Sequence, residues 1–160
     1  MPLIRLNNQS ISSVTALPYG VGGKVLQVVQ STNATQVANN TSSMADTGLS
    51  GTITPTSSSS KILIIAHQAF GKNADNNQID ADLLRGSTTI LSNWLNDHVF
   101  TNSASYNFVP PSALVYLDSP STTSATVYKT QFRNAAGNST YVFAQVNSST
   151  SVMNLLEIAN

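Results

Sequence analysis

The fold of this chain is decided by one short stretch, Ala125-Thr126-Val127-Tyr128-Lys129-Thr130-Gln131-Phe132-Arg133. Its side chains alternate in character, because Tyr128 and Phe132 fall on one side of an extended backbone and Lys129, Gln131 and Arg133 on the other. Successive side chains of a β-strand point to opposite faces, so this alternation predicts a strand with one buried and one wet face. Such strands are typical of an antiparallel sheet packed against a core.

Similar strand signals follow one another from Lys24 onward, separated by clusters of Ser, Thr, Asn, Gly and Pro. Eight or nine short strands at this spacing indicate an antiparallel sandwich or barrel. The runs at residues 24–30 and 61–67 are apolar on both sides. They predict central strands whose two faces are both covered, the second of them ending at a structural His67.

Two further segments carry specific expectations. The last strand signal, residues 152–159, places Val152, Leu156 and Ile158 on one face with Asn154, while Glu157 points away. It runs almost to the C-terminus, so we expect this end of the chain to be built into the sheet. After a hairpin turn at residues 86–87, strand and helix both fit, because the apolar positions of residues 90–95 also share one helical face.

The composition bounds the function. The chain has 160 residues, the size of one domain, and only 9% of them are charged, with a formal net charge of zero. Ser, Thr and Asn together supply 57 residues, so hydroxyls and amides solvate the surface. A basic stripe for nucleic acid is missing, and no apolar run reaches the ~18 residues that span a bilayer. The chain has no cysteine, which excludes thiolate metal sites and cysteine nucleophiles.

Residues 1–23 form a segment distinct from the rest. It carries two apolar stretches and ends in the Gly-rich sequence of residues 20–23, which indicates a hinge. The segment is too short to fold alone, so we expect an extended docking arm, followed by one β-sandwich domain over residues 24–160. The apolar residues that would dock are Leu3, Ile4, Leu6, Ile11, Val14 and Leu17.

Few residues point to chemistry. Asp80 and Asp82 lie two apart on an expected strand and so share a face, which makes them weak candidates for a calcium site. The chain lacks EF-hand spacing, a Gly-x-Ser-x-Gly motif and a zinc ligand set. We therefore expect no catalytic residues, no cofactor and no enzymatic activity.

Aromatic residues in the middle third offer a second kind of site. Exposed aromatic rings beside Asn and Asp are how proteins stack and hydrogen-bond sugars. Loops carrying Asp75, Trp94 and Tyr106 are therefore candidates for binding a glycan or receptor. Packing in a core or an oligomer interface is the alternative role for the same aromatic residues.

Several longer motifs resemble a β-sandwich module of virion proteins from tailed bacteriophages, especially phages of aquatic bacteria, including cyanobacteria. They are residues 23–29, 48–55 with 57–63, 83–88, 117–129 and the closing Leu156-Glu157-Ile158-Ala159. The resemblance covers about residues 24–160. It implies a jelly-roll-like sandwich that forms a homotrimer, located either on the head surface or at a tail-fibre tip.

The resemblance and the short arm together favour a capsid decoration or cement protein on the head surface. Its partners would be further copies of itself and the major capsid protein. The alternative is a tail-fibre or head-fibre tip, docked on a fibre adaptor, that recognises a host-surface glycan. A polysaccharide-degrading enzyme is the third class, for which no convincing acid/base pair of carboxylates is present.

Overall fold

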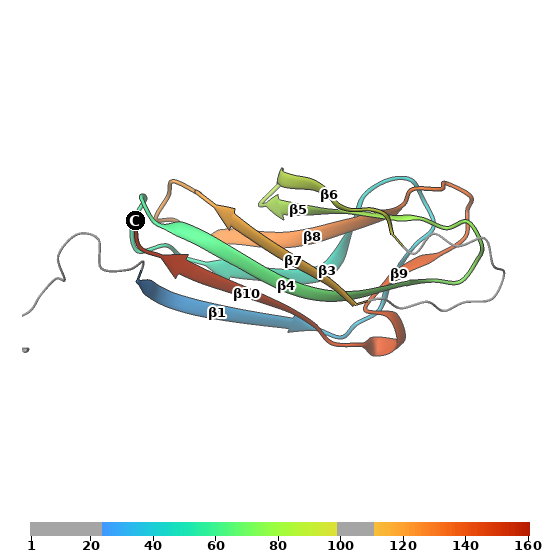
Figure 1. Cartoon of the computed structure of the whole chain (residues 1–160), viewed down its shortest axis with the longest axis horizontal. Helices are drawn as coiled ribbons and strands as arrows, with labels where there is room; N and C mark the ends of the chain where they lie inside the picture. Colours follow the sequence, from blue (N-terminus) through green and yellow to red (C-terminus); the bar gives the residue numbers. More distant parts are fainter. Residues whose placement is uncertain (1–23, 99–110) are drawn as a thin grey trace, which may run out of the picture.

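A computed structural model describes residues 24–98 and 111–160, and Figure 1 shows their arrangement. Within these ranges the chain is built from β-strands and one short 3-10 turn, Val146–Ser148. The strands are β1 (Val25–Asn33), β2 (Val37–Asn39), β3 (Ala45–Ile53), β4 (Lys61–Lys72), β5 (Ile79–Arg85), β6 (Thr88–His98), β7 (Pro111–Asp118), β8 (Thr126–Asn134), β9 (Val142–Ala144) and β10 (Ser151–Ile158). No helix in the described part is long and apolar enough to cross a membrane.

The strands form two antiparallel sheets. The large sheet has the order β1-β10-β4-β9-β2, with β7 also paired to β4, and the small sheet has the order β3-β8-β5-β6. Without the short strands β2 and β9, the eight long strands pair first with last, second with seventh, third with sixth and fourth with fifth. This nesting is that of a hairpin rolled into a sandwich, the jelly roll. The predicted all-β antiparallel sandwich is therefore confirmed.

The core lies between the two sheets. Its larger part unites Leu49, Ile64, Leu83, Tyr128 and Leu155, which come from β3, β4, β5, β8 and β10. A second cluster around Phe70, Phe132 and Val142 continues it, with the Phe70 and Phe132 ring centroids 6.1 Å apart. Tyr128 and Phe132 thus face the core, as the alternation of residues 125–133 predicts.

The alternation within β10 is also confirmed. Met153, Leu155 and Glu157 point inward, and the residues between them are half-buried on the outer side. β10 lies between β1 and β4 and ends at Ile158, and the Ala159 amide donates to the Lys24 carbonyl over 2.9 Å. The end of the chain is part of the sheet, as expected.

Strand β6 replaces the helix that residues 90–95 could have formed. It pairs with β5 through three register shifts, so that the partners Ala81 and Leu83 on β5 correspond to Leu95 and Leu91 on β6. Bulges insert extra residues into one strand of a pair. They space the inward residues of β6 four apart, which imitates the i, i+4 period of a helix.

Residues 24–30 do form a strand, but the expectation of a central strand with both faces covered is wrong. β1 pairs only with β10 and lies at the edge of the large sheet, where Val25, Leu26 and Val28 are exposed. His67 is also corrected, because β4 continues to Lys72 and His67 lies within the strand on its exposed side. In both strands the second apolar side faces outward from the sandwich rather than into a covering layer.

Candidate functional site

The outer face of the small sheet is polar and carries two ion pairs. Lys129 Nζ lies 2.9 Å from Asp46 Oδ2, and Arg133 binds Asp80 Oδ2 through Nε at 3.0 Å and Nη2 at 2.7 Å. Burial raises the pKa of Asp46, but hydrogen bonds from Lys129 and Gln131 outweigh it, so the pKa lies below its usual value. This face is a network of satisfied groups, which water can cover without further partners.

Asp80 and Asp82 do share this face, and both serve the bulges of β6. Asp82 Oδ1 accepts the Asn93 amide at 2.7 Å, and Asp80 Oδ1 accepts the Asp97 amide at 3.1 Å. Asn93 and Asp97 have φ values of 49° and 50°, the left-handed region in which bulge residues often lie. Within residues 24–98 and 111–160, no three His, Asp or Glu side chains gather as a metal site.

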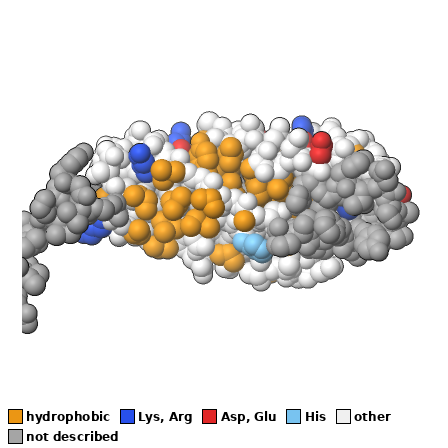
Figure 2. Space-filling model, viewed as in Figure 1, with side chains coloured by type: hydrophobic (Ala, Val, Ile, Leu, Met, Phe, Trp, Pro, Cys, Tyr) orange, Lys and Arg blue, Asp and Glu red, His pale blue; other side chains and the backbone are white. Residues whose placement is uncertain are grey.

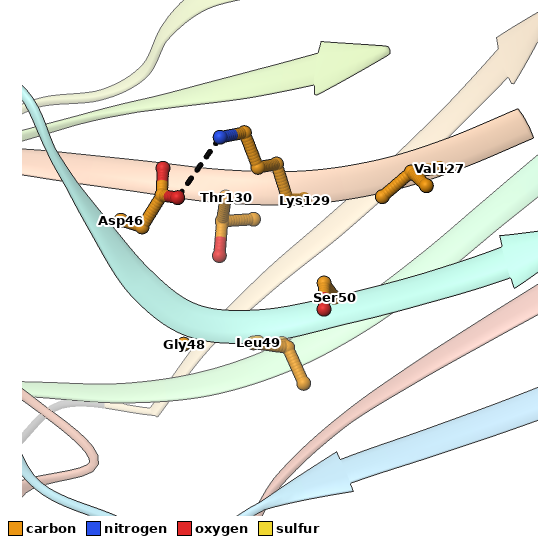
Figure 3. A pocket seen from close by; sticks show the side chains of 7 residues that line it. All are labelled: Asp46, Gly48, Leu49, Ser50, Val127, Lys129 and Thr130. Atoms are coloured by element: carbon orange, nitrogen blue, oxygen red, sulfur yellow. Dashed lines mark hydrogen bonds and ion pairs between the residues drawn. The ribbon is translucent and has the colours of Figure 1, made fainter. Parts of the chain in front are cut away.

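A small pocket lies between β3 and β8, where their register shifts (Figure 3). In Figure 3 the Asp46 and Lys129 side chains point toward one another across it, while Leu49 points to the other side of β3. Its volume of about 120 Å³ is well below the ~300 Å³ of a typical ligand pocket. The pocket therefore has room for a few waters and not for a substrate-sized molecule.

The candidate glycan residues do not lie together on a described loop. Trp94 is on strand β6, half-buried against both core clusters, with its ring centroid 6.0 Å from that of Phe70. The expectation that Trp94 lies on a loop is therefore wrong. Asp75 lies in the β4–β5 connection beside buried Lys72. Burial holds the pKa of Lys72 below its usual value, although the nearby Asp75 charge raises it. Tyr106 is outside the described residues, as are all six residues of the expected arm.

Glu157 is a buried carboxylate that sequence reasoning placed correctly on its strand but gave no role. Its Oε1 accepts the Thr56 amide at 2.7 Å and the Thr56 hydroxyl at 2.8 Å, and its Oε2 accepts Gln27 Nε2 at 2.7 Å. Burial raises the pKa of Glu157, yet these hydrogen bonds outweigh burial and lower the pKa to about 2. The carboxylate therefore ties β1, β10 and the loop after β3 into one unit.

Asp118 joins the two sheets. It lies on β7 of the large sheet. Its Oδ2 forms an ion pair with Arg85 Nη1 at 2.9 Å and accepts a hydrogen bond from the Tyr128 hydroxyl at 2.7 Å, and both partners belong to the small sheet. Burial and this hydrogen bond raise the pKa of Tyr128 above its ordinary value. Thr130 adds a second link, because its hydroxyl donates to Gln68 Oε1 over 3.0 Å.

The outer face of the large sheet differs sharply from that of the small sheet. We call it the apolar face, and Figure 2 shows its hydrophobic side chains gathered into one area with a histidine at the edge. It carries Lys61, His67, Gln30, Asn154 and Thr32 as its polar members. Its apolar members are Val25, Leu26, Val28, Leu63, Ile65, Ala113, Val115, Leu117, Val152, Leu156 and Ile158.

The pairing of the strands aligns these residues in rows across the sheet. One row runs Val28, Leu156, Leu63 and Leu117 over β1, β10, β4 and β7. The next row runs Gln30, Asn154, Ile65 and Val115. Its two amides are hydrogen-bonded to one another, since Gln30 Nε2 donates to Asn154 Oδ1 over 2.8 Å.

The signal for the apolar face was present in the sequence, in the runs at residues 24–30 and 61–67 that are apolar on both sides. What the sequence could not supply was the layer that each side meets. The sequence predicts for both runs a central position with both sides covered. The structure covers one side with the core and leaves the other exposed.

No protein-family model matches the chain, and no curated protein matches it. Among solved structures, the chain is similar to the VP2 subviral particle of infectious bursal disease virus, with 14% identity and a TM-score of 0.45. It is also similar to a structure of the Gt strain of the same virus, with 12% identity and a TM-score of 0.46. The matches cover 99% of this chain but only 44% of each of those chains. What the strand order itself defines is a jelly-roll β-sandwich protein.

Proposed function

We propose that this chain is a non-enzymatic structural protein of a bacteriophage virion, a homotrimer that decorates the head and stabilises it. The observation that carries the proposal is the strand order of the two sheets, because the jelly roll recurs in viral capsid and lectin domains. The resemblance of residues 24–160 to phage virion modules points in the same direction.

The described charged groups fit a structural role. Asp46, Asp80, Asp118 and Glu157 are held by internal hydrogen bonds or ion pairs, which leaves them engaged in the fold. Among the described residues, Arg85, Lys129 and Arg133 are each paired with a carboxylate. Contact with proteins rather than with nucleic acid is the role that this surface supports.

Decoration would act through binding energy alone, with no cofactor. The arm at residues 1–23 would dock on the major capsid protein through its apolar residues, and three arms on one trimer would raise the avidity. Deletion of residues 1–20 should then abolish binding to heads that lack the protein. The circular dichroism of the folded sandwich should remain unchanged, which separates lost docking from lost folding.

Copy number per virion tests the proposal directly. Purified virions of the phage that encodes the chain would be separated by electrophoresis and stained quantitatively against the major capsid protein. A copy number in proportion to the capsid lattice is the expected result. A few copies per virion would favour the alternative, a fibre tip that binds a host glycan through loops near Asp75. Absence from virions, or glycan turnover by the purified protein, would overturn the structural role.

A further inference from the structure

We propose that the apolar face binds a second copy of this chain. It is the outer surface of β1, β10, β4 and β7, and in a lone sandwich such a surface would meet water. Val115 and Val28 are 66% and 59% exposed there, and Leu117 is 50% exposed. Large exposed apolar patches mark interaction sites in soluble proteins.

The contrast between the two outer faces is the first argument. The outer face of the small sheet, which we call the polar face, carries the ion pairs of Asp46 with Lys129 and of Asp80 with Arg133. The apolar face has almost no charged side chains. An antiparallel sandwich with two wet faces would show polar side chains on both. The large sheet instead has the composition of a sheet that packs on another layer.

The edge of the sheet gives the second argument. β1 is nine residues long, lies at the edge and exposes Val25, Leu26 and Val28. Long apolar edge strands lead to aggregation unless something covers them. Because Val28 begins the row that continues through Leu156, one partner could cover the edge residues and the face together.

Charge and area identify a second copy as the occupant. Among the defined members of the face the only charged or ionisable side chains are Lys61 and His67, with no carboxylate, so the face offers no charge pattern for a charged partner. The chain's net charge of zero leaves no net repulsion between copies. Four strands about 4.8 Å apart and eight residues of about 3.3 Å each give roughly 500 Å² per face. Two such faces pressed together give a total of about 1,000 Å², the lower limit for a specific interface.

This inference goes beyond the proposed homotrimer, because a face that packs on the same face of a second copy makes a two-fold contact that closes as a pair. It does not depend on a virion location. Self-association is measured on the purified full chain, whereas the virion role is measured on virions. A monomeric full chain would also remove the homotrimer from the proposed function, whereas an oligomer that tolerates a charge on the apolar face would overturn this inference alone.

The first experiment is the molar mass of the full chain by light scattering during size exclusion, compared with Val115→Glu and Val127→Glu. Val127 is the matched control, since it is a 40% exposed valine on the outer side of β8, on the polar face. We expect an oligomer for the wild type and for Val127→Glu. Val115→Glu should raise the dissociation constant at least about 100-fold, because association would bury an unpaired carboxylate. A monomeric wild type, or an oligomer that Val115→Glu leaves intact, would overturn the inference.

A second measurement is independent of any charged variant. The chain has no cysteine, so Val115→Cys and Val127→Cys each carry a single thiol. In the oligomer, Val115→Cys should react with a maleimide at least about tenfold more slowly than Val127→Cys, and dilution to monomer should remove the difference. Equal rates in the oligomer would contradict the inference. So would protection that persists in the monomer, because the face would then be covered by the chain itself.

Discussion

At the scale of single residues, Glu157 makes the stability of the protein depend on pH. Its carboxylate is fully buried, accepts three hydrogen bonds and has a pKa of about 2, compared with 4.5 for an ordinary glutamate. A carboxyl whose pKa is lower in the folded state stabilises the protein above its unfolded pKa. That contribution is lost as the pH falls through the folded value.

We expect the free energy of unfolding of the wild type to decrease between pH 4.5 and pH 2 in part through Glu157. Glu157→Gln removes this titration, so its unfolding free energy should fall less over the same interval. At pH 7 it should lie about 1–3 kcal/mol below the wild type, because Gln27 and Thr56 lose a charged acceptor. Urea unfolding at a series of pH values measures both effects. Parallel curves for the two proteins would show that Glu157 does not titrate with folding.

At the scale of elements, strand β6 shows how two carboxylates shape a strand. Asp82 and Asp80 on β5 accept the amides of Asn93 and Asp97, the two left-handed residues of β6. Amides at bulges have no partner in the ladder of the sheet. The carboxylates supply that partner, so the pair that the sequence suggests as calcium ligands anchors the bulged strand.

Asp82→Ala should weaken one bulge and spare the other. We expect the amide of Asn93 to exchange with solvent about 3–10-fold faster, the effect of losing one hydrogen bond, while the amide of Asp97 keeps its rate. Asp82→Asn retains an acceptor oxygen and is the matched control. Nuclear magnetic resonance detects the exchange at each amide. Equal acceleration at both amides would mean that Asp82 supports β6 as a whole.

At the scale of the whole molecule, Asp118 fastens one sheet to the other. It is bound by Arg85 and Tyr128 of the small sheet and is largely buried, whereas Asp46 and Lys129 form an exposed pair within the small sheet. Breaking a buried ion pair leaves uncompensated polar groups, while an exposed pair contributes little. The two aspartates therefore allow a comparison between a buried link that joins the two sheets and an exposed ion pair within one sheet.

Asp118→Ala should lower the free energy of unfolding by about 3 kcal/mol, the cost of leaving a half-buried guanidinium and a buried phenol unpaired. Asp46→Ala should lower it by less than about 1 kcal/mol. Denaturant unfolding of both variants at neutral pH measures the difference. Similar losses for the two variants would mean that the link between the sheets is not a major source of stability.

The sequence by itself determined the class of the fold and the parity of its strands. Tyr128 and Phe132 face the core, and Lys129 and Gln131 face outward. On β10 the side chains of Leu156 and Glu157 point to opposite sides of the sheet. Both patterns follow from the period of two, which is a property of the local backbone. The turn at residues 86–87 was equally local. None of these features depends on which strands become neighbours.

Only the tertiary structure decided what each face meets. The apolar run of β1 reads like a central strand until its pairing with β10 alone places it at the edge, and the inward residues of β6 look helical until its bulges are aligned with β5. The apolar face exists because Val28, Leu156, Leu63 and Leu117 come from four separated segments that pairing brings into one row. Strand order and register are set by contacts between residues far apart in the chain, so local periodicity cannot specify them.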